Sequence, residues 1–296
     1  MFSQFVFWPW FTGLIFLIVG LFASRRELSA VRGLDKLVAL GRVFVACSLA
    51  TFGAEHLAGA RFVVNAVPAW MPARMFWTYF VGLSLIAAAS SFVAMKFVRV
   101  SAALLALMFF LFVLMIHVPN VVANIKDRIV WAVALRDLAF AGGALAFAAS
   151  QAREWKSGMS NRLIFNRLIS AGRLCVAIPV LVFAVEHFLH PEFAPGVPLP
   201  KLTPAWVPLR VVWGYLAGAI LLVAGMGLLV NKKPRTAAAC IGLLMTVLTV
   251  CLYLPILAQG GPPSDLIVGV NYVADTLLFA GTVLVLAAVL PRAGTA

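Results

Sequence analysis

Two Glu-His dipeptides are the residues of this chain whose types and positions could do chemistry. Glu55 and His56 close one long apolar run, and Glu186 and His187 close another. Ionisable groups cost about 2.5–3.5 kcal/mol near a bilayer centre, so they are seldom incidental there. A carboxyl beside an imidazole can relay protons or hold a polar head group. The alternative is a structural lock, in which each Glu pairs with an arginine and each His bonds a helix end. We take the four residues as catalytic candidates and keep the lock open.

The same histidines raise the question of a metal. Haem held between His56 and His187, or zinc held by His187 and His190, are the weaker alternatives, because the chain has no C-x-x-C-H sequence and only four histidines. The four cysteines all lie inside apolar runs and form no C-x-x-C, so a dithiol redox site is absent. We therefore predict no metal site, and no cofactor is evident apart from a quinone, which the chain could bind.

The composition indicates what must position these residues. Hydrophobic residues make up 64% of the 296-residue chain and charged residues 11%, with a mean hydropathy of +1.04. Apolar runs of roughly 20 residues are typical of transmembrane helices, and the runs do not alternate as barrel strands would. We predict an all-α integral membrane protein with about nine transmembrane helices. The predicted spans are 5–23, 37–58, 75–95, 100–121, 129–150, 170–189, 210–230, 236–257 and 267–290.

The basic residues predict the orientation rather than a nucleic-acid partner. The net charge is +13, but Lys and Arg fall mostly in short gaps between the runs, and they are concentrated in alternate gaps. Under the positive-inside rule the richer side is cytoplasmic. We expect an inner-membrane protein in contact with lipid, with the N-terminus outside and the C-terminus in the cytoplasm. The first span lacks a basic leader and is followed by Arg25 and Arg26, which favours an uncleaved anchor.

The Glu-His pairs belong to an internal duplication. Residues matching at an offset of 131 run from Gly41 and Arg42 to His56, and after a five-residue insertion the offset becomes 136. The stretch PAWMPARMFWTYFVG matches PAWVPLRVVWGYLAG at eight of fifteen positions, including both tryptophans. Each copy holds four spans, so the copies share one orientation and should be related by a pseudo-twofold axis along the membrane normal. This predicts two parallel-repeat four-helix bundles plus one N-terminal helix. The predicted segments are 1–36 (N-terminal helix and loop), 37–150 (first repeat), 151–168 (basic linker), 169–291 (second repeat) and 292–296 (tail).

The repeat places further polar and aromatic residues near the predicted outer face. Adjacent helical residues point about 100° apart, so Glu55 and His56 should face different neighbours. We expect one polar cavity per repeat in the outer leaflet. The candidate ligand-binding residues are His117, Asp137, Trp77 and Tyr79 in the first copy and Tyr253, Asp275, Trp213 and Tyr215 in the second. The candidate structural residues are the helix-end arginines Arg42 and Arg173 and the P-A-W-x-P residues Pro68, Trp70, Pro72, Pro204, Trp206 and Pro208.

The pattern G-R-x(3)-A-x(5)-F-x-x-E-H, followed by P-A-W-x-P-x-R-x-x-W-x-Y-x-x-G, resembles the DoxX family of four-helix membrane proteins. The resemblance covers nearly all of 37–150 and 169–291, while the fusion and the first span depart from the family's usual single unit. It implies a link to quinone-dependent sulfur oxidation and to membrane redox complexes, and it transfers no catalytic residue set. Three functions follow as hypotheses: a quinone-linked redox subunit, a binding protein or carrier for a lipid-like molecule, and a scaffold subunit in a membrane complex. If the chain is an enzyme, it is a quinone-linked oxidoreductase subunit, with other membrane redox subunits as partners.

Overall fold

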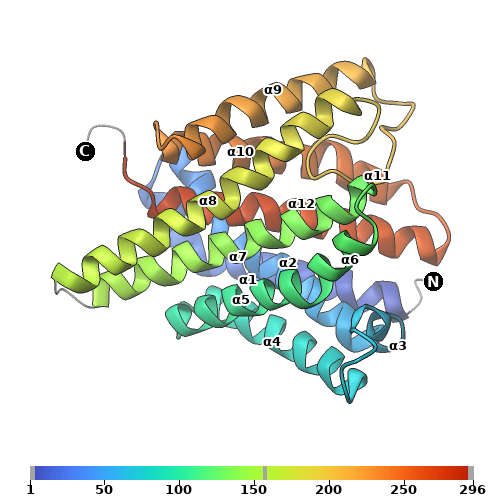
Figure 1. Cartoon of the computed structure of the whole chain (residues 1–296), viewed down its shortest axis with the longest axis horizontal. Helices are drawn as coiled ribbons and strands as arrows, with labels where there is room; N and C mark the ends of the chain where they lie inside the picture. Colours follow the sequence, from blue (N-terminus) through green and yellow to red (C-terminus); the bar gives the residue numbers. More distant parts are fainter. Residues whose placement is uncertain (1–3, 156–158, 293–296) are drawn as a thin grey trace.

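The computed structural model describes residues 4–155 and 159–292 and is built from helices (Figure 1). Among these residues nine helices are long and apolar enough to cross a membrane, and an isolated bridge between Phe193 and Leu202 is the only β-pairing. The predicted all-α membrane fold is therefore confirmed. The elements are α1 Gln4–Ala30, α2 Leu34–Ala58, α3 Ala60–Val63, η1 Val64–Ala66, α4 Arg74–Ala94, α5 Val98–Phe112, η2 Val113–His117, α6 Val118–Ala123, α7 Arg128–Trp155, α8 Met159–Leu189, α9 Arg210–Leu229, α10 Pro234–Leu248, η3 Thr249–Tyr253, α11 Leu254–Ala258 and α12 Pro263–Val289.

The helices run side by side, so the molecule has two distinct ends. The first, which we call the Glu-His end, carries the C-terminal ends of α2 and α8 with the connections 59–73 and 190–209. The second, the basic end, carries the turns at 31–33, 95–97 and 230–233. α1 begins at the Glu-His end and α12 finishes at the basic end, as an odd number of crossings requires (Figure 1). The sequence predicts that the basic end faces the cytoplasm.

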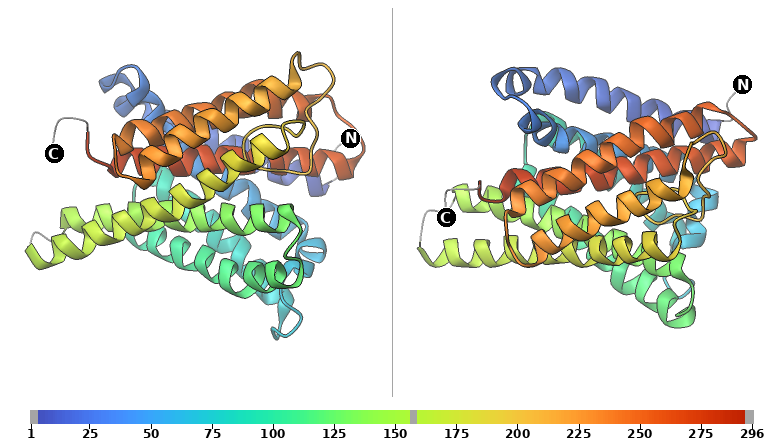
Figure 2. Two further views of the ribbon diagram at one scale, coloured as in Figure 1. Left: turned by 45° about the horizontal axis from the view of Figure 1, so that its top comes forward. Right: turned by 90° about the horizontal axis from the view of Figure 1, so that it is seen from above.

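The contacts between helices recur at matching positions in the two repeats. The first helix of each repeat packs on the last helix of the other: α2 on α12, and α8 on α7. The two last helices, α7 and α12, meet between the repeats. Most of the second repeat gathers in one half of the molecule and α4, α5 and α7 in the other (Figure 2). One continuous apolar core spans both repeats, so they form a single packed body.

Glycines allow these crossed contacts to be close. A Cβ on Gly281 of α12 would lie 2.8 Å from the carbonyl oxygen of Gly41 on α2. At the corresponding contact, a Cβ on Gly142 of α7 would lie 2.6 Å from the carbonyl oxygen of Gly172 on α8. Gly41 and Gly172 are equivalent in the sequence repeat. Small residues at both crossings let the helix backbones touch, which is the usual basis of helix association in membranes.

The backbone repeats its irregularities at the offset of 136. The π-helical turns η2 and η3 begin at Val113 and Thr249, which are related by that offset. Six non-glycine residues have positive φ, and they form three pairs at the same spacing. Left-handed backbone is unfavourable for such residues, so its recurrence shows that both copies close their turns in the same way. The pairs are Ala73 with Leu209, Met95 with Asn231, and Phe97 with Lys233.

The first span lies outside the repeat and covers the groove between α2 and α12. Gly13 and Gly20 of α1 face Thr51 and Val43 of α2, and a Cβ on Gly20 would lie 2.7 Å from a methyl group of Val43. α1 also contacts α12. The added helix thus covers part of the surface of α2 and α12 on one side of the molecule.

The segment predicted as a linker, 151–168, is mostly helical. α7 continues to Trp155 and α8 starts at Met159, so the two helices project together beyond the rest of the basic end (Figure 1). Arginine and other straight-chain residues have high helix propensity, and this stretch has no proline to stop either helix. Lys156 of this segment, and residues 293–296 of the predicted tail, lie outside the described residues.

Candidate functional site

In the first repeat, Glu55 and His56 face different neighbours. The Glu55 carboxylate points to α12, where its Oε1 accepts a hydrogen bond of 3.1 Å from the side-chain amide of Asn271. His56 turns instead toward α4, where Gly82 leaves room for its Cβ. The imidazole Nδ1 lies 2.8 Å from the carbonyl oxygen of Phe52 and donates to it, because a carbonyl can only accept. The acid thus crosses to the other repeat, and the histidine stays within its own.

The second repeat divides its pair in the same way. Glu186 lies 3.4 Å from the Arg128 guanidinium, at the start of the first repeat's last helix. His187 packs over Gly218 of its own repeat, and its Nδ1 donates to the carbonyl oxygen of Phe183 at 2.5 Å. The N–H of Gly196 donates to His187 Nε2 at 2.8 Å, so both ring nitrogens are used and the imidazole is neutral.

The five-residue insertion explains this difference between the histidines. Residues 194–199 form a run of six buried residues that enters the end of the second bundle. The run supplies the Gly196 N–H and also the carbonyl oxygen of Pro195, which accepts a hydrogen bond of 3.0 Å from the Tyr253 hydroxyl. In the first repeat, His117 occupies the position equivalent to Tyr253. In the second repeat the buried run 194–199 therefore binds His187 and Tyr253, and the first repeat has no equivalent insertion.

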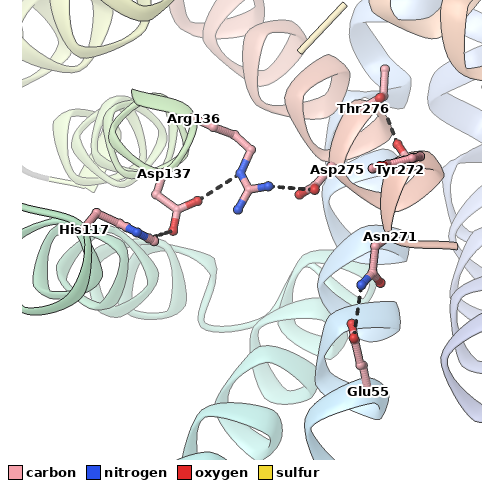
Figure 3. A network of polar contacts seen from close by, with 8 residues as sticks. All are labelled: Glu55, His117, Arg136, Asp137, Asn271, Tyr272, Asp275 and Thr276. Carbon is pink, nitrogen blue, oxygen red and sulfur yellow. Dashed lines mark hydrogen bonds and ion pairs between the residues drawn. The ribbon is translucent and has the colours of Figure 1, made fainter. Parts of the chain in front are cut away.

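A chain of charged side chains joins the repeats at the contact of α7 with α12 (Figure 3). His117 Nε2 lies 2.8 Å from the Asp137 carboxylate. The neighbouring Arg136 reaches Asp137 at 3.2 Å and, with its other arm, Asp275 of the second repeat at 2.7 Å. The Asp137 and Asp275 side chains are buried, with 7% and 10% of their surface exposed, so Arg136 compensates two carboxylates away from water.

Glu55 extends this group, because its partner Asn271 lies one helical turn before Asp275 on α12. Asp137, Asp275 and Glu55 are three carboxyl groups, opposed by the single guanidinium of Arg136. Protons taken up within the cluster can offset the remaining negative charge. A cluster with more acids than bases in a low-dielectric interior must bind protons to become neutral. The arrangement can therefore store and exchange protons.

Sequence reasoning did not single out Asn271 or Arg128 as part of the site. Asn271 and Asp275 are four residues apart, so their shared helix face was a readable signal. Arg128 stands at a helix start, where a sequence offers no hint of its partner.

The predicted aromatic residues other than the buried Tyr253 lie on the outside of the bundle. Trp77 and Trp213 each donate from Nε1 to a carbonyl oxygen at 3.0 Å, that of Pro72 and that of Pro208. Both indoles thus close their own P-A-W-x-P turn. The remaining aromatics and prolines of the prediction are exposed or partly exposed and do not contact the charged network; they are Pro68, Trp70, Tyr79, Pro204, Trp206 and Tyr215.

The paired arginines of the repeat bind helix ends. Arg42 donates to the carbonyl oxygen of Phe92 at the end of α4, and Arg173 donates to that of Leu228 at the end of α9. Phe92 and Leu228 are related by the offset of 136. Carbonyl groups at a helix C-terminus have no partner within the helix, so a guanidinium there satisfies them. Arg42 makes a further contact that Arg173 lacks, an ion pair of 2.7 Å with Glu27 of α1.

An apolar cavity of about 200 Å³ lies under α1, and we call it the α1 cavity. Its walls come from α1, α2, α10 with η3 and α11, and α12. Cys47 and Thr51 line it from α2, on the helix face that carries Glu55 one turn further on. Four further cavities are described. Of the eight candidate ligand-binding residues, Tyr79 borders one of them, beside residues 57–62, and the other seven line none of the five.

No protein-family model, no curated protein and no solved structure matches the chain. Within residues 4–155 and 159–292, no group of three or more His, Cys, Asp or Glu side chains is arranged to hold a metal ion.

Proposed function

We propose that the chain is a DoxX-like membrane subunit that binds a quinone-like molecule in the α1 cavity and exchanges protons through the charged network. The observation that carries the proposal is the position of Glu55, which continues the cavity wall formed by Cys47 and Thr51 and belongs to the network between the repeats. An apolar ring would lie in the cavity, with its polar edge toward the carboxyl groups.

The size and lining of the cavity agree with one ring and not with a whole isoprenoid molecule. Ligands of drug size occupy about 300–1,000 Å³, whereas the α1 cavity has about 200 Å³. The polar side chains in its wall include the hydroxyls of Thr51, Thr246 and Thr249, which donate to carbonyl oxygens of their own helices and keep lone pairs free to accept. Such a wall suits a quinone in its hydroxyl form, and a tail would leave between α1 and α10 into the lipid.

In this proposal, a bound quinone supplies the electron-carrying group, and a partner redox subunit exchanges the electrons. The chain's own residues hold the head group and move protons. Glu55 lies one helical turn beyond Thr51 of the cavity wall, and Asp275 and Arg136 extend the path across the repeat interface toward Asp137. The excess of carboxyl groups over guanidinium groups is what lets this path accept and release protons.

The test compares equivalent residues of the two repeats. Purified protein is extracted with organic solvent, and quinone is measured by absorbance in wild type, Glu55→Gln and Glu186→Gln. We expect Glu55→Gln to lower quinone retention severalfold at normal yield. Glu186→Gln should leave retention unchanged, because Glu186 pairs with Arg128 and lines none of the described cavities.

A second pair of variants tests the place of binding. Val250 lines the α1 cavity and is 55% exposed, whereas Val247 is 47% exposed on the same helix and does not line it. Val250→Trp should lower retention and Val247→Trp should not. Wild-type protein that retains no quinone and takes none up on addition would refute the proposal.

A structural function has its own supporting observation, because Arg136 ties the two repeats together through Asp275. If Glu55→Gln and Glu186→Gln both lower the yield and neither changes retention, the Glu-His pairs are structural locks and the chain is a scaffold. If the protein retains lipid but no quinone, it is a binding protein for a lipid-like molecule.

A further inference from the structure

A second cavity, which we call the basic cavity, lies in the groove under α1 at the opposite end of the molecule. It has a volume of about 330 Å³ and lies where α1, α2, α7, α10, α12 and the residues after α12 converge. Unlike the α1 cavity, it is lined by charged and amide groups. Its polar side chains are Glu27, Asp35, Arg42, Gln151, Arg235 and Arg292.

The charges of the basic cavity do not balance. Arg42 pairs with Glu27 at 2.7 Å, and Arg235 pairs with Asp35 at 2.6 Å. The third guanidinium, that of Arg292, approaches the other oxygen of Asp35 at 3.7 Å. Three guanidinium groups and two carboxylates thus line the cavity, so its lining side chains carry a net charge of +1.

The guanidinium groups keep donors for a further partner. Arg42 uses one terminal nitrogen on Glu27 and the other on the carbonyl oxygen of Phe92. Arg235 uses one on Asp35 and the other on the carbonyl oxygen of Ala287. Each terminal nitrogen carries two N–H groups, and a guanidinium also has its Nε–H. The side chains of Arg42 and Arg235 are 13% and 17% exposed, so these donors are held in place beside the cavity.

The place of this cavity indicates which anion would fill it. It opens at the end of the bundle where Lys96, Arg99, Lys232 and Lys233 gather, which is the predicted cytoplasmic side. Basic pockets between transmembrane helices on that side bind the head groups of anionic lipids. Arginine also suits phosphate better than lysine does, because its planar fork bonds two oxygens at once.

We propose that the basic cavity binds the phosphate group of an anionic membrane lipid, held by Arg42, Arg235 and Arg292. The lipid joins the added helix α1 and the segment after α12 to both repeats at one point. This site is separate from the α1 cavity and holds whether or not a quinone binds there.

Arg292 provides the test, because its side chain is 68% exposed and its removal should not disturb folding. The control is Lys232→Gln, which removes one positive charge at the same end from a residue that does not line the cavity. Retention of phosphatidylglycerol and of phosphatidylcholine is measured by native mass spectrometry of detergent-purified protein, and inorganic phosphate is added as a competitor.

We expect wild type to retain phosphatidylglycerol in preference to phosphatidylcholine. Arg292→Gln should lower phosphatidylglycerol retention about fivefold, the factor expected for one basic residue near an anionic surface. Lys232→Gln should lower it less, and Asp35→Asn should raise it, because the excess positive charge increases. Equal retention of the two lipids by wild type, or equal losses in Arg292→Gln and Lys232→Gln, would overturn the proposal. Inorganic phosphate that binds in an Arg292-dependent manner while phosphatidylglycerol does not would show a site for free phosphate and overturn the lipid as its source.

Discussion

Replacing Arg136 with methionine tests the physical reasoning behind the charged network most directly. The guanidinium compensates Asp137 at 3.2 Å and Asp275 at 2.7 Å, and its side chain is 18% exposed. Removing one partner of a buried ion pair costs about 3–5 kcal/mol, because the other charge stays buried without compensation. Arg136→Met leaves Asp275 in that state, while Asp137 keeps His117. We therefore expect a loss of about 3–5 kcal/mol in the free energy of unfolding, at the upper end if neither carboxyl takes up a proton.

Replacing the acidic partner of the ion pair should lower the free energy of unfolding less than replacing Arg136. In Asp275→Asn, Arg136 keeps its ion pair with Asp137, and an amide oxygen replaces the Asp275 carboxylate oxygen as acceptor. The loss in the free energy of unfolding should therefore be about 1–3 kcal/mol. Arg128→Met should cost less than about 1 kcal/mol, because its pair with Glu186 is longer and more exposed.

Unfolding by denaturant in mixed micelles, followed by tryptophan fluorescence, measures all three variants against wild type. The double variant Arg136→Met/Asp275→Asn should lose less than the sum of its two single losses, which is the signature of a direct interaction. If Arg136→Met costs no more than Arg128→Met, or if the losses simply add, then the repeats do not depend on this ion pair and the reasoning is wrong.

Three further predictions follow from other parts of the molecule. Phe97 has a φ of 56°, and left-handed backbone costs a non-glycine residue about 1–2 kcal/mol, which exceeds the entropic cost of about 0.5–1 kcal/mol for a glycine. Phe97→Gly should therefore raise the free energy of unfolding, and a lower unfolding temperature would contradict this. His187→Phe leaves the Gly196 N–H without an acceptor and should cost about 1–3 kcal/mol. His56→Phe should cost less, because it removes only the hydrogen bond to the Phe52 carbonyl oxygen; thermal unfolding compares the two variants. A reporter fused after Ala296 should be cytoplasmic and a tag at Met1 external, and labelling of Lys201 only from the cytoplasmic side would reverse the orientation.

The broad architecture could be predicted because it depends on local patterns. A run of apolar residues long enough to cross a bilayer has to be helical, whatever it packs against, since the backbone must satisfy its own hydrogen bonds there. The paired Glu-His and P-A-W-x-P segments likewise indicated two copies in one orientation, and the paired π-turns at Val113 and Thr249 repeat the same offset in the backbone. The ends of α7 and α8 were predicted less well, because helices in water can continue beyond the apolar run that identifies the span.

The polar residues show where sequence reasoning stopped. It placed Glu55, His56, Asp137 and Asp275 near one end of the bundle, and it stated that neighbours on a helix face different ways. It did not tell which of Glu55 and His56 faces the other repeat, because that depends on the rotation of α2 against α12.

What the sequence by itself determined is thus the set of helices, their repetition and the position of each polar group along its helix, all of which follow from hydropathy and spacing along the chain. The tertiary structure alone decided which charges meet. Arg136 and Asp275 are separated by 139 residues and Glu55 and Asn271 by 216, and only the packing of α12 against α7 and α2 brings each pair together. It also decided that the two copies differ, because the buried run 194–199 seals His187 and Tyr253 in one repeat. Contacts of this kind depend on how helices rotate and cross, which is set by the close approach of small residues such as Gly142 and Gly281 and not by any pattern within a single helix.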